Sequence, residues 1–147
     1  MATYLLDTNI VLRFSNPSDR QHQLVVNAIT NLLEQEHELV LVPQVLIEMW
    51  VVGTRPTDVN GLGWSTTYTS NIIRQLLERF PLIEEDSTIF SNWLRIVSNN
   101  NIVGKRTHDA RIVATMQSAE ITHILTLNPK DFSRIPDLMV VHPAEIV

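Results

Sequence analysis

Residues 4–9 are Tyr4-Leu5-Leu6-Asp7-Thr8-Asn9, a short apolar run followed by a carboxylate and two turn-forming residues. An apolar run of this length, ended by turn formers, predicts a buried first strand. In open α/β sheets, sites form beyond the carboxyl ends of the strands. The stretch therefore predicts a first strand that ends at a candidate site residue, Asp7.

The rest of the chain alternates between apolar runs and helical periodicity. Further strands are predicted at about residues 38–42, 81–83, 121–126 and 138–141. Helices are predicted at about residues 10–14, 18–36, 43–52, 65–79, 86–97 and 108–118. This alternation favours an α/β fold with a mainly parallel central sheet flanked by helices. No repeat or linker interrupts residues 1–147, which we interpret as a single domain.

Several polar residues are spaced as helix caps. Ser18 and Gln21 match a capping box, Asp86 and Thr107 are expected caps of later helices, and Pro43 suits the first position of a helix. Residues 53–64 hold three of the four glycines and form the longest predicted loop. Long loops in compact domains are often functional, so this loop is of interest.

Composition excludes several classes of protein. The 147 residues are 44% hydrophobic and suit a globular core, and the absence of cysteine excludes disulfides and thiolate metal sites. No apolar run reaches the roughly 20 residues that span a membrane. The first residues lack the basic segment of a signal peptide. We therefore expect a cytoplasmic protein with no membrane partner.

Four isolated acidic residues lie where predicted strands end or helices turn: Asp7, Glu48, Asp109 and Asp131. Three of them adjoin apolar runs, where a carboxylate is costly unless something compensates its charge. A divalent cation that gathers several carboxylates would do so. Magnesium prefers oxygen ligands and retains water, which is a candidate nucleophile for phosphodiester cleavage. The set predicts a metal-dependent nuclease.

Each acid also has an ordinary structural interpretation. Asp7 suits the N-cap of the following helix, and Asp109 lies where a carboxylate stabilises a helix N-terminus. Asp131 follows a proline in a turn, where exposed aspartate is common. Glu48 is the most informative, because only Gln44 and Glu48 interrupt an apolar helix, four residues apart on one stripe. The inference therefore depends on the four acids as a set.

The formal net charge of −5 is unusual for a protein that binds nucleic acid. Setting the four candidate ligands aside leaves 12 acidic residues against 11 lysines and arginines, which is almost neutral. RNA binding then needs a local basic rim. Basic residues close in sequence to the acids are Arg13, Arg55, Lys105, Arg106, Arg111 and Lys130, and the RNA-contact candidates among them are Arg55, Lys105 and Arg106.

Four motifs together resemble a known family. They are Leu5-Leu6-Asp7-Thr8-Asn9, Glu48 in the helix after the second strand, His108-Asp109-Ala110, and the stretch from Ile124 to Phe132 that contains Asp131. In order and rough spacing they resemble PIN-domain ribonucleases, especially the VapC-type toxins of toxin–antitoxin pairs. The resemblance covers nearly the whole chain. It implies a three-layer α/β/α PIN fold and a Mg²⁺- or Mn²⁺-dependent endoribonuclease.

The resemblance also implies roles and partners. Asp7, Glu48 and Asp109 would hold the metal, and Thr8, Asn9 and Thr126 would orient the carboxylates or the metal-bound water. Many relatives carry an acid shortly after the threonine, where this chain has Asn128 in a turn one residue longer. Either Asp131 or Asn128 would complete the site. Family likeness further implies a homodimer and a small antitoxin protein.

The Asn128 departure leaves a second hypothesis open. The chain is then a non-catalytic PIN-like module with a degenerate metal site that binds RNA or a protein without cutting. Magnesium-dependent phosphatases of the haloacid dehalogenase type are disfavoured, because they need Asp-x-Asp after the first strand and this chain has Asp7-Thr8-Asn9. Receiver domains need paired acids at the same place, and these are absent.

Overall fold

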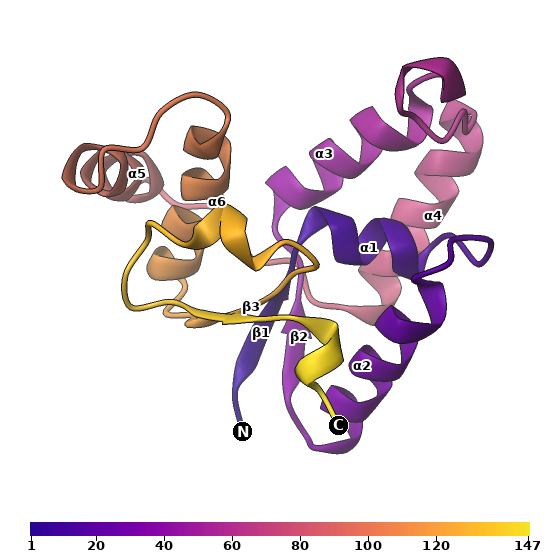
Figure 1. The fold of residues 1–147 in the computed structure, drawn as a ribbon, viewed down its shortest axis with the longest axis horizontal. Coiled ribbons are helices and arrows are strands. Elements are labelled where there is room, and N and C mark those ends of the chain that lie inside the picture. Colours follow the sequence, from indigo (N-terminus) through magenta and orange to yellow (C-terminus); the bar gives the residue numbers. More distant parts are fainter.

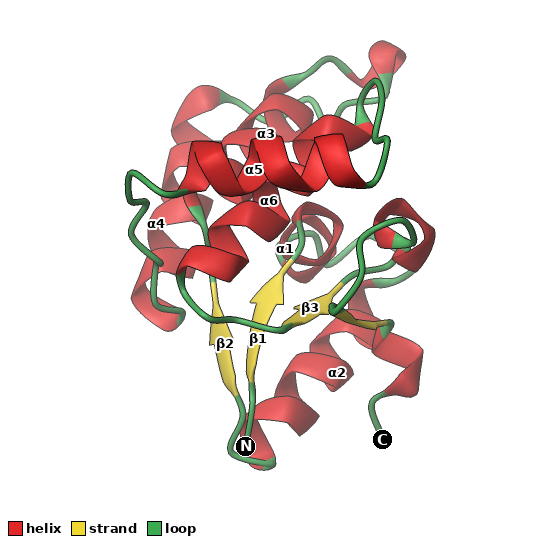
Figure 2. Cartoon of the chain, turned by 90° about the vertical axis from the view of Figure 1, so that its left-hand side faces the viewer, coloured by secondary structure: helices red, strands yellow, loops and turns green.

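A four-stranded sheet with every strand parallel forms the centre of the molecule (Figures 1 and 2). The computed structural model describes residues 1–147. The strand order is β2-β1-β3-β4, and the strands are β1 (Thr3–Leu6), β2 (Glu38–Val40), β3 (His123–Leu125) and β4 (Met139–Val141). The predicted α/β fold with a mainly parallel sheet is confirmed, and it agrees with a PIN-like arrangement.

Six helices flank the sheet: α1 (Thr8–Phe14), α2 (His22–Glu34), α3 (Pro43–Thr54), α4 (Thr66–Arg79), α5 (Ile89–Asn99) and α6 (Arg106–Ser118). Three short 3-10 helices follow β-strands or helices: η1 (Thr57–Val59), η2 (Pro129–Phe132) and η3 (Pro143–Glu145). In Figure 1, α5 and α6 lie on one side of the strands and α2 and α4 on the other. None of the helices has the length and apolar character needed to cross a lipid bilayer.

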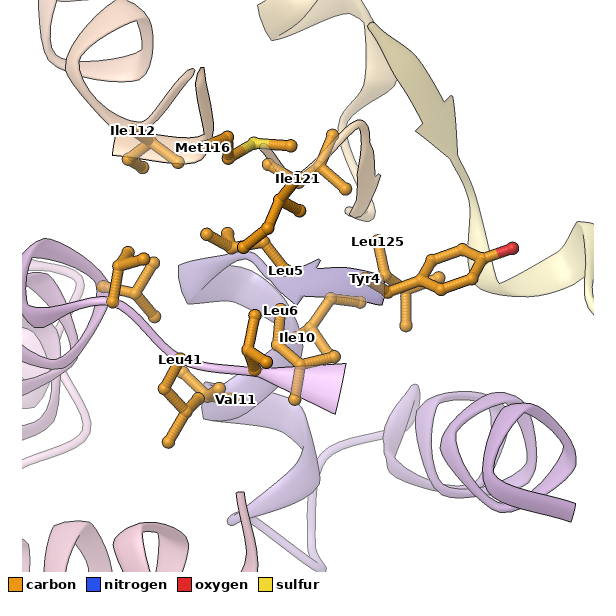
Figure 3. Close-up of a cluster of buried hydrophobic side chains, with 14 of the residues drawn as sticks. Tyr4, Leu5, Leu6, Ile10, Val11, Leu41, Ile112, Met116, Ile121 and Leu125 are labelled. Atoms are coloured by element: carbon orange, nitrogen blue, oxygen red, sulfur yellow. The ribbon is translucent and has the colours of Figure 1, made fainter. Parts of the chain in front are cut away.

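The core explains why β1 occupies a central position. Leu5 and Leu6 are fully buried, and successive strand residues point to opposite faces of a sheet. Figure 3 shows β1 side chains between those of α6, including Ile112 and Met116, and those of α1, including Ile10. A strand that is apolar on both faces is stable only with helices above and below it, which is the arrangement found.

The expected strand at residues 81–83 was wrong. This segment makes only an isolated bridge, Leu41 to Leu82, with one backbone hydrogen bond from the Leu41 amide to Pro81 and one from the Ile83 amide to Leu41. Pro81 has no amide hydrogen, so it adds no donor to a ladder. The segment therefore runs parallel to the chain at Leu41 for one bridge and forms no strand.

The helix starts also differ from the expected caps. Ser18 donates to the Asn16 side chain, so it makes no capping box with Gln21, and α2 begins at His22. Thr107 lies inside the first turn of α6, where its hydroxyl donates to the Gly104 carbonyl.

Two other expected helix starts have clearer outcomes. Asp86 organises the turn before α5 by accepting from the Thr88 amide, while α5 itself begins at Ile89. Pro43 does occupy the first position of α3, as predicted.

The segment after α3 is an ordered loop built around one glycine. The Gly61 amide donates to the Pro56 carbonyl and the Gly63 amide donates to the Arg55 carbonyl. A Cβ at residue 61 would lie 1.8 Å from the Arg55 carbonyl oxygen, far inside contact distance. The backbone at this position therefore requires glycine.

We predict that Gly61→Ala lowers the free energy of unfolding by about 1–3 kcal/mol, the usual cost of overpacking. Urea unfolding followed by circular dichroism measures it. Asn60→Gly is the matched control, since Asn60 already has a left-handed backbone with φ of 64° that glycine adopts freely. Equal stability of the Gly61→Ala and wild-type proteins would contradict the close approach.

Candidate metal centre at the carboxyl edge of the sheet

Asp7 lies at the carboxyl end of β1 and also caps α1. One carboxylate oxygen accepts from the Thr8 amide at 2.8 Å, and the other accepts from the Thr126 hydroxyl at 2.7 Å. Only 6% of the residue is exposed. Asp7 is therefore both a candidate site residue and the N-cap of α1. Because β1 leads directly into α1, the residue that ends the strand lies at the N-terminus of the helix.

Three polar residues predicted to support the site surround Asp7. Asn9 donates to the Thr126 hydroxyl at 3.2 Å and accepts from the Leu127 amide at 3.0 Å. The Thr126 hydroxyl also accepts from the Asn128 amide at 3.1 Å. These bonds join the end of β1 to the segment after β3. They orient the Asp7 carboxylate from residues more than a hundred positions away in sequence.

Glu48 faces the same edge from the middle of α3. Its carboxylate accepts from the Thr8 hydroxyl at 2.7 Å and from the Gln44 amide nitrogen at 2.9 Å. The same Gln44 nitrogen donates to the His108 carbonyl at 2.7 Å. The polar stripe of α3 therefore faces the site, and Gln44 connects α3 with the first turn of α6.

Asp109 and Asp131 share one arginine. Arg106 lies 3.4 Å from the Asp109 carboxylate and 3.0 Å from that of Asp131. Asp109 lies in the first turn of α6 and Asp131 in η2. Arg106, predicted as an RNA contact, thus lies among the acids and offsets part of their charge.

Burial and mutual repulsion make the ionised acids costly. Burial, followed by the charges of Asp109 and Glu48, raises the pKa of Asp7 from 3.8 to about 6, against the lowering by hydrogen bonds from Thr126 and Thr8. Burial, followed by the Asp131 charge, likewise raises the pKa of Asp109 to about 6, although Arg106 lowers it. Each of the four acids therefore interacts through its charge with at least one of the others.

The donor set fits a hard divalent cation, because all four side chains offer carboxylate oxygens and their ionised forms repel one another. No three of the acidic or histidine side chains converge closely enough to form a ready coordination group. Part of the carboxylate capacity is taken by the Arg106, Thr8 and Gln44 donors. The acids form one charged cluster whose carboxylates are partly occupied by these partners.

The remaining predicted residues lie at different distances from the cluster. Lys105 immediately precedes α6 and is exposed. The Asn128 side chain is exposed, and this residue contributes its backbone amide. Arg55 follows the end of α3, seven residues beyond Glu48 and so about 10 Å along the helix axis. There it donates to the Asn60 carbonyl and holds the loop.

Sequence reasoning did not identify the bridging role of Gln44. The only signal was its place four residues before Glu48 on the polar stripe of α3. It also did not identify the pairing of Arg111 with Glu85 at 2.9 Å and with Gln44 at 3.2 Å. These contacts join segments that are far apart in sequence, and the spacing of nearby residues does not predict which distant segments lie together in the fold.

The geometry defines an α/β domain with an acidic site at the carboxyl edge of a parallel sheet. The family model described as "PIN domain" matches residues 4–138, so the chain belongs to the PIN-domain family. No curated protein matches the chain significantly. The motifs from Asp7 to Asp131 all lie inside the matched range.

Solved structures share this fold at low sequence identity. One is a chain of VapBC2 from Rickettsia felis, in a structure bound to a DNA fragment from the VapBC2 promoter. It has a TM-score of 0.70 and 19% identity, and the match covers 95% of this chain and 98% of that one. A chain of a toxin–antitoxin complex from Klebsiella pneumoniae has a TM-score of 0.65 and 24% identity, covering 95% and 97%. A chain of FitAB bound to an IR36 DNA fragment has a TM-score of 0.69 and 18% identity, covering 98% and 97%.

We predict that Asp7→Asn changes how stability depends on pH. Since the folded-state pKa of Asp7 lies above its ordinary value, the wild-type protein loses stability as pH rises from about 4 to about 6. Asparagine carries no charge and avoids this loss. The free energy of unfolding of the variant minus that of wild type should therefore be larger at pH 8 than at pH 4. The expected increase in this difference is roughly 2–3 kcal/mol.

Urea unfolding in EDTA at the two pH values measures this difference. Asp58→Asn, at an exposed position in η1, is the matched control and should leave the pH profile as in wild type. A constant difference between Asp7→Asn and wild type at both pH values would contradict the burial cost.

Proposed function

We propose that the chain is a metal-dependent endoribonuclease that acts as the toxin of a toxin–antitoxin pair. The observation that carries the proposal is that Asp7, Glu48 and Asp109 lie at one sheet edge of a PIN-domain chain, close enough for their charges to interact, with the pKa of two of them raised by burial and repulsion. Catalytic sites are where such perturbed carboxylates concentrate. Packing of the core does not require these acids, so a catalytic role is the better explanation of the cluster.

Asp7, Glu48 and Asp109 would hold Mg²⁺ or Mn²⁺, with Asp131 or Asn128 completing the set. Such a cation lowers the pKa of a bound water and stabilises charge on the phosphate. The protein's own contribution is orientation: Thr126 holds Asp7, and Thr8 holds Glu48. Lys105 immediately precedes α6 and Arg106 begins it, and there both would contact the phosphate backbone of RNA.

The partners are proposed from the solved relatives, which include toxin–antitoxin complexes. We propose a small antitoxin that covers the acidic cluster, and a homodimer as the assembly of this single-domain cytoplasmic protein. Co-purification of a small protein encoded beside this chain would support the antitoxin. A monomer in light scattering would contradict the homodimer.

A non-catalytic binding module is the second candidate function. Two observations favour it: Asn128 stands where many relatives carry an acid, and Arg106 already pairs with Asp109 and Asp131. An internal cation of this kind compensates the acids without a metal. This candidate predicts no divalent-dependent hydrolysis of any RNA.

We predict that Asp7→Asn abolishes RNA cleavage while the protein stays folded. Wild-type and variant proteins are incubated with mixed structured RNAs in Mg²⁺, Mn²⁺ or EDTA, and the products are separated by electrophoresis. Cleavage is expected only for wild type with metal. Melting curves give a second readout, because a cation that binds the folded state raises the Tm of wild type and not of the variant.

Two results would count against this mechanism. Full cleavage by a folded Asp7→Asn protein would exclude the role of Asp7. No cleavage and no metal-dependent rise in Tm of the wild-type protein would favour the non-catalytic module.

We predict that Gln44→Met lowers cleavage by about 10- to 100-fold, the usual effect of losing a group that orients a metal ligand. Methionine fills similar space without donating to Glu48 or to the His108 carbonyl. Single-turnover cleavage measures the loss, and circular dichroism checks the fold. Gln23→Met is the control, because Gln23 is exposed on α2 and bonds only to Asn27. Unchanged cleavage by Gln44→Met would contradict an orienting role.

A further inference from the structure

A cavity of about 480 Å³ lies beside the acidic cluster and takes no part in it. It lies between the segment before α5 and the N-terminal halves of α5 and α6. Figure 2 shows these two helices side by side. The volume falls within the range of pockets that bind small organic groups. Ile89, Phe90 and Trp93 supply its apolar walls.

The aromatic wall has an exposed ring that the fold does not need. Phe90 is 68% exposed, more than any other aromatic side chain of the chain. Its ring lies 5.7 Å from that of Trp93, with the two planes tilted by 34°. An exposed phenylalanine gains little from the hydrophobic effect in the isolated chain. Two neighbouring rings at the mouth of a cavity suit a flat ligand that stacks on them.

The position of this wall is fixed relative to the acids. The Trp93 indole nitrogen donates to the Thr107 carbonyl at 2.8 Å. Thr107 lies in the first turn of α6, two residues before Asp109. The stacking surface and the candidate metal ligand are therefore attached to the same turn of helix, which leaves little freedom between them.

A neighbouring cavity extends to Glu48. A second cavity of about 300 Å³ is lined by Gln44 and Glu48, and it shares Glu85, His108 and Arg111 with the first. Arg111 stands at the junction, donating to Gln44 and to Glu85. The two cavities are therefore adjacent, one reaching a carboxylate of the acidic cluster and the other the Phe90 ring.

The charged residues that line the two cavities favour different parts of a nucleotide. Glu85 and Asp86 line the Phe90 cavity, and Glu85 is paired with Arg111. The Asp86 carboxylate has only neutral hydrogen-bond partners, so its charge repels a phosphate. An uncharged aromatic group meets no such repulsion and gains from the rings. Arg111, which lines both cavities, is the group suited to the connecting phosphate.

We propose that the Phe90–Trp93 cavity binds an unpaired nucleobase of the RNA, next to the phosphate held at the acidic cluster. The inference rests on the proposed nuclease function and adds to it a binding site for one base of the RNA. A base within a duplex is stacked between its neighbours and does not reach such a cavity, whereas unpaired bases stack on aromatic side chains.

Binding is tested in the Asp7→Asn background with EDTA, so that no RNA is cut. Short fluorescein-labelled oligoadenylate, oligocytidylate and oligouridylate are titrated with the protein, and fluorescence anisotropy is followed. Phe90→Ala should weaken binding by about 5- to 150-fold, the range found for loss of one stacked base. Phe90→Tyr keeps the ring and should retain the affinity.

Leu94→Ala is the matched control, since Leu94 is 49% exposed on the next turn of α5 and does not line the cavity. It should leave affinity unchanged, and a duplex probe should be insensitive to Phe90→Ala. Unchanged single-strand affinity in Phe90→Ala, an equal loss in Leu94→Ala, or no binding to any probe would overturn the inference.

A protein partner on this surface is a separate outcome. Conversion of a dimer to a monomer by Phe90→Ala in light scattering would also overturn the inference, because a second copy would then cover the cavity. None of these results bears on cleavage by the wild-type protein, which tests the proposed nuclease function independently.

Discussion

The burial of the Asp7 carboxylate is the constraint on which the rest of the structure depends. A desolvated carboxylate is tolerated only where donors surround it, and here the donors come from both α1 and the segment after β3. The parallel pairing of β1 with β3 places Thr126 beside Asp7. Strand register, helix start and site geometry therefore all contribute to compensating this one charge.

A second layer of bonds spreads the constraint to α3 and α6. Thr8 follows Asp7 in sequence and donates to Glu48, and Gln44 connects Glu48 to the first turn of α6. The four acids thus belong to elements that are tied together by neutral side chains. These donors and Arg106 offset the repulsion between the acids, so several carboxylates can lie at one edge of the sheet in the folded protein.

The fold class followed from the sequence because its signals are local: apolar runs for strands, helical periodicity between them, and Asp7 at a strand end. The family of the chain followed from the order of four motifs. Local spacing failed where several polar residues compete, as at Ser18, which bonds to Asn16 and leaves the start of α2 to His22. It also failed for contacts between distant segments, such as Gln44 with the His108 carbonyl, 64 residues apart.

The bond between Thr126 and Asp7 has a consequence for biosynthesis. The two residues are 119 positions apart, so β1 leaves the ribosome long before its neighbour β3 exists. Non-local pairing of this kind forms late, since closing a long loop costs entropy before any contact is made. An incomplete chain that stops before residue 126 has all of Asp7, Glu48 and Asp109 but lacks the strand and hydroxyl that arrange them. A nascent chain therefore assembles its acidic site only after β3 and Thr126 have been synthesised.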